Sequence, residues 1–350
     1  MSRAFAASLH CRLPALLFLF QGALLVVFVL FVTFDEHMDA VAQPAPSGPA
    51  SNLLHATFSL FRDVQLMLLA GLGLLLAFMK GYGLSAVAFN FLLISVCTQW
   101  TLVVQGFTYH CHDGRIHLGL HNILTAEFAA VTVLISAGAI LGRTSPVQLL
   151  PMGLCEIPLD MAVDVGGTLT LHVFACYFGL GTTIALHWPA LQLGHPKETP
   201  PYSSDLLSLV GTTFLWAFWP GFVAVLIQPG HAHASALPSF AASSLLEKKG
   251  KLHAGHLQNV ALAGGAAIGA VADMAVTPSG AFSQCGVVTN VAPTTFMATS
   301  RLPPVGEDLG RSASQQALYQ AAVLVACVLV SLAGSILPGL ILKLPCLAHK

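Results

Sequence analysis

The chain has 350 residues, of which 55% are hydrophobic and only 8% are charged, and its mean hydropathy is +0.77. Soluble domains carry about 25% charged residues, so this composition excludes a water-soluble globular protein and predicts a multi-pass membrane protein. The net charge of −1 argues against nucleic acid as a partner.

Eight apolar stretches are candidates for membrane spans, since a spanning helix needs about 20 apolar residues. Arg3 and Arg12 precede the first run, which is longer than a signal-peptide core, so we predict a helix that enters from the cytoplasm. In chain order, the predicted spans are residues 13–34, 64–80, 84–106, 119–141, 168–188, 206–228, 257–278 and 317–343. We therefore expect an all-α polytopic protein embedded in the lipid bilayer as one membrane domain, residues 1–350.

The predicted topology fails at three places along the chain. Residues 150–167 are too polar for a span and are interrupted by Pro and Gly. Successive loops must lie on opposite sides of the membrane, however, and this requires a crossing nearby. Residues 235–246 are too short to cross before the lysine cluster at 248–251. Residues 279–316 are rich in Pro, Ser and Thr and show no periodicity. The sequence therefore predicts that spanning segments are missing.

Histidines cluster in the segment "YHCHDGRIHLGLH", at residues 109–121. Their spacing matches no closed metal site, which favours a solvated outer loop. The eight cysteines include no Cys-x-x-Cys pair, which favours buried thiols over disulfides or metal ligands. With no Walker loop, nucleophile elbow or His-Glu-x-x-His motif, we expect neither an enzyme nor a cofactor.

Several polar or aromatic side chains lie inside predicted spans. His172 is ionisable, and such a residue inside a span is a functional-site hypothesis by default. Glu127 is interpreted as a helix-end or interhelical polar contact rather than a transport residue. Trp216 and Trp219 are interpreted as packing or interface residues.

Several blocks together resemble the Rh glycoproteins of the ammonium transporter (Amt/Rh) family. They are "FRDVQLMLLAGLGLLLAFMKGYGLSAVAFNFLL", "LISAGAILGRTSPVQLL", "VDVGGTLTLHVFACYFGL", "GTTFLWAFWPGF" and "KGKLHAGHLQNVALAGGAAIG". The resemblance implies an ammonium-transporter-like helix bundle of two inverted halves around a narrow pore, assembled as a trimer. It further implies a plasma-membrane channel for ammonia or ammonium, with carbon dioxide left open as a second permeant.

The resemblance assigns four residues to the substrate path. Phe128 in "TAEFAA" and Phe222 in "WPGF" match the two gating phenylalanines. Asp164 matches an acid that organises the entrance, although its place before "VGGTLTLH" also suits a helix cap. His172 matches the first of two pore histidines. A narrow apolar tube lined by a neutral imidazole would pass ammonia and reject the costly ammonium ion.

The chain departs from the family where the topology fails. The segment "QCGVVTNVAPTTF" (284–296) lacks the second pore histidine, and chain is missing relative to the family near 157–162, near 235–246 and over 281–310. About eight spans are recognisable, so we expect a shortened Rh-like chain. The alternative is a non-conducting Rh-like subunit that assembles with conducting homologues.

Overall fold

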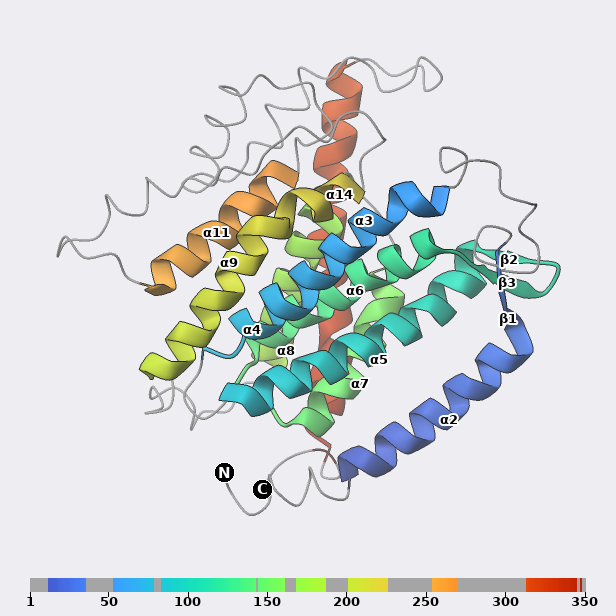
Figure 1. Cartoon of the computed structure of the whole chain (residues 1–350), viewed down its shortest axis with the longest axis horizontal. Coiled ribbons are helices and arrows are strands. Elements are labelled where there is room, and N and C mark those ends of the chain that lie inside the picture. Colours follow the sequence, from blue (N-terminus) through green and yellow to red (C-terminus); the bar gives the residue numbers. More distant parts are fainter. Residues whose placement is uncertain are drawn as a thin grey trace.

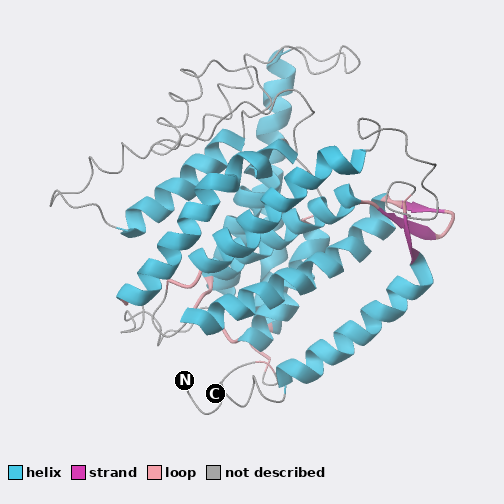
Figure 2. Ribbon diagram, viewed as in Figure 1, coloured by secondary structure: helices cyan, strands magenta, loops and turns pink. Residues whose placement is uncertain are grey.

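The structure, a computed structural model, describes residues 12–35, 53–78, 83–142, 144–160, 168–186, 201–225, 254–269 and 313–344, together with Leu347. It is a bundle of helices with one small sheet at the edge (Figure 1). The predicted all-α membrane fold is confirmed for the bundle, and Figure 2 shows how little of the chain is strand.

The first half of the chain contributes the helices that pack across the middle of the bundle. The elements are α2 (Leu13–Phe31), β1 (Val32–Phe34), α3 (Leu53–Gln65), the π-helix η3 (Leu66–Leu72), α4 (Gly73–Leu75), α5 (Gly83–Tyr109), β2 (Cys111–His112), β3 (Arg115–Leu118) and α6 (Leu120–Ala139). In Figure 1, α2 lies at the outer edge beside α5, whereas α6 lies inside the bundle.

The second half of the chain supplies the remaining described helices, three of which contact α6. Its described elements are α7 (Pro146–Glu156), the 3-10 turn η4 (Ile157–Leu159), the π-helix η6 (Thr168–Val173), α8 (Phe174–Ala185), α9 (Tyr202–Val225), α11 (Ala254–Gly269) and α14 (Ala313–Ile341). Helix α8 packs on both α6 and α14, and α9 packs on α3, η3 and α11. Figure 1 shows α9 and α11 side by side at the edge opposite α2.

Five described helices are long and apolar enough to cross a membrane. They are Leu13–Phe31, Thr57–Leu75, Gly83–Tyr109, Leu120–Ala139 and Ala321–Ile341. Leu169–Ala185 is a shorter apolar helix. Helix α9 has 24 residues.

Two predicted span boundaries are wrong. The predicted span 13–34 ends as a helix at Phe31, because residues 32–34 form strand β1. The predicted span 64–80 is shifted, since the helical segment runs from Leu53 to Leu75. The apolar run alone misplaced this start, because the helix continues through the polar pair Arg62 and Asp63, whose side chains form an ion pair at 3.7 Å.

The segment 109–121, predicted as a solvated outer loop, contains a β-hairpin. Strands β2 and β3 pair antiparallel, and β1 pairs with β3 in parallel, with Val32 opposite Ile116. Asp113 and Gly114 make the turn with positive φ angles of 52° and 75°. Asp-Gly is a strong signal for such a turn, because glycine and aspartate tolerate that backbone region. Among the described residues, no group of three His, Cys, Asp or Glu side chains could hold a metal ion.

Helix α7 stops well short of a membrane span. Together with η4 it covers residues 146–159, a length of about 21 Å for an α-helix, whereas the hydrocarbon core is about 30 Å thick. Ser145 and Gln148 begin it, with the Ser145 N–H donating to Gln148 Oε1 at 2.8 Å. The predicted gaps at 235–246 and 281–310 lie outside the described residues, whereas 157–160 of the predicted gap near 157–162 are described and form η4 and the residue after it. The single-domain assignment and these gaps stay predictions.

Candidate functional site

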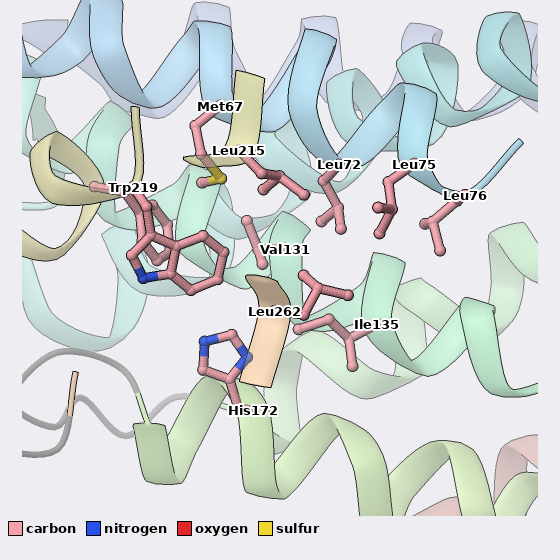
Figure 3. A pocket seen from close by; sticks show the side chains of 11 residues that line it. Met67, Leu72, Leu75, Leu76, Val131, Ile135, His172, Leu215, Trp219 and Leu262 are labelled. Carbon is pink, nitrogen blue, oxygen red and sulfur yellow. The ribbon is translucent and has the colours of Figure 1, made fainter. Parts of the chain in front are cut away.

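A cavity of about 160 Å³ lies between the helices in the middle of the bundle. A water molecule occupies about 30 Å³ in the liquid, so the cavity has room for several molecules of that size. Its lining side chains come from both halves of the chain and are nearly all apolar (Figure 3): Met67, Leu72, Leu75, Leu76, Val131, Ile135, His172, Leu215, Trp219, Phe222 and Leu262. His172 is the one ionisable side chain among them.

Two π-helices bring residues to this cavity. Met67 and Leu72 belong to η3, and His172 belongs to the last turn of η6, just before α8 begins. A π-helical turn inserts an extra residue into a helix and is frequent at functional sites. The insertion redirects the side chains of that turn, so the local backbone contributes to placing the imidazole at the cavity.

The His172 ring stacks on the indole of Trp219. The ring centroids are 5.8 Å apart and the planes differ by 15°. Figure 3 shows the imidazole reaching from its helix towards Trp219 and the aliphatic side chains. His172 Nε2 is buried and has no hydrogen-bond partner among the described residues, and the same holds for Trp219 Nε1. An unpaired buried nitrogen costs about 1–3 kcal/mol, so each of these atoms is available to a small guest molecule.

Two phenylalanines pack together at one side of the cavity. The rings of Phe128 and Phe222 lie 4.4 Å apart, and both side chains are buried. Phe222 lines the cavity and also packs on Trp219, which lies one helical turn away on α9. The centroids of these two rings are 5.6 Å apart. Phe128 continues the α6 face that carries Val131 and Ile135, since positions i, i+3 and i+7 share one side of a helix.

Three of the four residues assigned from the sequence lie together. Phe128, Phe222 and His172 form one connected group through the Trp219 ring. Asp164 lies outside the described residues, so its assignment stays a prediction. The segment 284–296, where the family has a second histidine, also lies outside them.

Trp219 is the residue that the sequence interpretation missed. It was assigned to packing or to the interface, whereas its indole lines the cavity and links His172 to Phe222. Its spacing three residues before Phe222 was a usable signal, because residues at i and i+3 face the same side of a helix. Trp216, also interpreted as a packing or interface residue, is half exposed and is not among the described residues that line the cavity.

Glu127 lies next to Phe128 and points towards a different helix. Its side chain is buried, and Oε1 accepts a hydrogen bond from Gln65 Nε2 of α3. The predicted interhelical contact is confirmed, and Glu127 does not line the cavity. The acid therefore stabilises the wall behind the phenylalanine pair.

The lining determines what the cavity can hold. A bare cation in such apolar surroundings carries a large desolvation penalty, and no carboxylate of the described residues lines the cavity to offset it. A small neutral molecule that makes one or two hydrogen bonds fits both the volume and the unpaired nitrogens.

Comparison with known proteins identifies the group to which this architecture belongs. The model of the Ammonium Transporter Family matches residues 23–302, which is most of the chain. The chain belongs to the ammonium transporter family. The resemblance to Rh glycoproteins is also confirmed, because the similar proteins include ammonium transporters of the Rh type.

Three of these relatives are the ammonium transporters Rh type B of Oryctolagus cuniculus, Rh type B-B of Xenopus laevis and Rh type B of Homo sapiens. The rabbit protein is 35% identical over 405 residues, which cover 95% of this chain and 88% of the relative. The frog protein is 33% identical over 417 residues, covering 98% and 91%. The human protein is 38% identical over 302 residues, covering 79% and 66%.

The alignments indicate internal shortening of this member of the family. The alignment with the rabbit protein spans 405 positions and the chain has 350 residues, so at least 55 positions (405 − 350) face a gap in this chain. The predicted shortening of an Rh-type chain is confirmed in this general sense.

Solved structures agree with the family assignment. Nitrosomonas europaea Rh50, described as one of the Rhesus protein family of channels, matches with a TM-score of 0.67 and 25% identity, covering 83% of this chain and 88% of that one. Saccharomyces cerevisiae Mep2 matches with a TM-score of 0.66 over 91% and 94% of the two chains. At 17% identity, the Mep2 likeness supports the fold alone.

Proposed function

We propose that the chain is a membrane channel that passes neutral ammonia through the cavity between Phe128, Phe222 and His172. The observation that carries the proposal is the buried, unpaired His172 Nε2 at an otherwise apolar cavity. Membership of the ammonium transporter family supports ammonia or ammonium as the transported species.

Ammonium gives its proton to the water outside, and neutral ammonia alone enters the cavity. Ammonium is hydrated outside and would lose that hydration among the leucines, whereas ammonia is uncharged and crosses at far lower cost. The paired phenylalanine rings close the path to hydrated ions, and their faces attract a cation at the mouth. His172 then offers a single hydrogen bond to the neutral molecule as it passes.

The proposal includes the wider setting that the family resemblance implies. The chain acts in the plasma membrane as a homotrimer, or in hetero-oligomers with other Rh proteins. Asp164 organises the entrance to the path. Carbon dioxide is a second permeant, since it is also small and uncharged.

Stopped-flow measurement of ammonia entry into proteoliposomes tests the proposal. We expect the protein to raise permeability above that of protein-free liposomes. His172→Ala removes one hydrogen-bonding group from the path, and a lost hydrogen bond of about 1.4 kcal/mol lowers permeability about tenfold. His117→Ala, in the exposed part of strand β3, is the matched histidine control and leaves permeability unchanged.

The same experiment separates the channel from a non-conducting Rh-like subunit. That alternative is favoured by one observation: the segment 284–296 of the sequence contains no histidine. Permeability equal to bare lipid, with the protein folded and inserted, would reject the channel and favour the subunit. Carbon dioxide entry, measured in the same vesicles, decides whether the second permeant belongs to the proposal.

A further inference from the structure

A second buried acid lies where three helices meet, away from the cavity lining. Glu156 is the last residue of α7 and is 0% exposed. Its Oε1 contacts the hydroxyl of Ser136 on α6. The same hydroxyl lies 3.0 Å from the backbone oxygen of Ala175 on α8. The Ser136 hydroxyl therefore bridges α7 to α8 in the middle of the bundle.

Counting hydrogens in this chain of contacts bears on the state of Glu156. A serine hydroxyl carries one hydrogen and a backbone carbonyl only accepts, so both contacts are hydrogen bonds only when Ser136 Oγ donates to Ala175 O. The contact between Ser136 Oγ and Glu156 Oε1 then needs a hydrogen from the carboxyl group. An ionised Glu156 would take the Ser136 hydrogen and leave two oxygens, Oγ and Ala175 O, in contact without one.

The surroundings of Glu156 favour the uncharged form independently of that count. Its second oxygen, Oε2, is buried and has no partner among the described residues. Among the described residues, the ionisable groups that act on it electrostatically are Cys97 of α5 and Asp160 after η4, and neither is a cation. No basic side chain of the described residues forms an ion pair with Glu156. A buried carboxylate without a partner is far more costly than a carboxylic acid.

We propose that Glu156 is held as a neutral carboxylic acid whose proton links α7, through Ser136, to the Ala175 carbonyl of α8. Ala175 lies three residues after His172, about one helical turn away along the same helical segment. The link fixes that turn against α6, where Ile135 lines the cavity beside Ser136. Glu156 is thus a positioning residue for the His172 ring, and this part rests on the proposed function.

Infrared spectroscopy of the full-length protein in lipid nanodiscs tests the proton directly. A protonated carboxyl has a carbonyl stretch that a carboxylate lacks. At a pH well above the usual range for glutamate, we expect the difference spectrum of wild type minus Glu156→Gln to contain that stretch. A carboxylate band in the difference spectrum instead would overturn the proposal.

Ammonia permeability of matched variants tests the positioning role. Glu156→Gln retains a donor for Ser136 and keeps wild-type permeability, whereas Glu156→Met has a similar size without a donor and lowers it about fivefold. Ser136→Ala lowers permeability to the same extent. Thr132→Val is the control, because Thr132 is buried on the same helix but donates only to Phe128 O within α6. Equal permeability in Glu156→Met and wild type would overturn the positioning role.

The proposed function and the state of Glu156 are tested independently by the two measurements. If wild type conducts no ammonia, the proposed function is wrong, while the infrared spectrum still decides the state of Glu156. The thermal stability of the same variants then takes the place of permeability for the helix link. Glu156→Met and Ser136→Ala must lower the unfolding midpoint while Glu156→Gln keeps it, and an unchanged midpoint in all three rejects the link.

Discussion

Helices α2 and α6 have nearly the same length but opposite surroundings. Both are long and apolar enough to span a membrane, with 19 and 20 residues. In the most apolar part of α2 only 11% of residues are buried, against 67% in α6. The most apolar helix is thus on the outside, and the helix that carries Glu127, Thr132 and Ser136 is on the inside.

This arrangement follows from the lipid acting as the solvent. Lipid tails are as apolar as leucine, so an apolar face gains little by leaving lipid for protein. Helices associate instead through close packing of small residues and through polar contacts. Helix α6 has both kinds, whereas the polar content of α2 is Gln21 alone. Changes in packing or polar groups should therefore matter at α6 and hardly at α2.

The largest expected effect comes from the close approach of α8 to α6 at Gly179. A side chain there would begin 2.7 Å from Ala139 Cβ and 3.0 Å from the Ser136 backbone oxygen. Gly179→Leu therefore forces the helices apart and lowers the free energy of unfolding by about 3 kcal/mol or more. The matched control is Gly22→Leu on α2, where nothing lies within 4 Å. Reversible unfolding in SDS-containing micelles measures both, and similar losses in the two variants would contradict the comparison.

An intermediate effect is expected from the polar contact between α6 and α3. Glu127→Leu leaves the part-buried Gln65 Nε2 without its acceptor, which should cost about 1 kcal/mol in the same unfolding assay. The double variant Gln65→Leu/Glu127→Leu removes both polar groups and should lose less than the two single variants together. Additive losses would show that the two side chains do not stabilise each other.

Most of the fold was predictable from the sequence because long apolar runs determine spanning helices. The sequence located α5, α6 and α14 to within a few residues of their bounds. It failed at the start of α3, where Arg62 and Asp63 interrupt the apolar run but not the helix. It also missed the small sheet, because β1 follows α2 without any drop in hydrophobicity, and its partner β3 is more than 80 residues away.

The site was only partly predictable, because its residues come from distant segments. Phe128, Phe222 and His172 were assigned from the family resemblance, and the structure brings the three into one connected group. Trp219 contacts both His172 and Phe222 only because α9 is rotated so that this face points towards η6. The local sequence does not predict that rotation. The contact of Glu156 with Ser136 joins residues 20 positions apart on different helices, so it too required the packed structure.

The smallest expected effect is at the contact that holds α2 to α5. Gln21 Nε2 donates to Gln99 Oε1 at 2.7 Å, beside the edge-on ring pair Phe20–Trp100, and the ring pair Phe31–Phe107 joins the two helices near the end of α2. Hydrogen bonds between membrane helices contribute about 0.6 kcal/mol on average, since the separated helices find other partners. Gln21→Leu should therefore lower the free energy of unfolding by about 0.6 kcal/mol, and a double-mutant cycle with Gln99→Leu should return the same value as the coupling energy. A loss as large as that of Glu127→Leu would mean that α2 is held as firmly as α6, against its exposure to lipid.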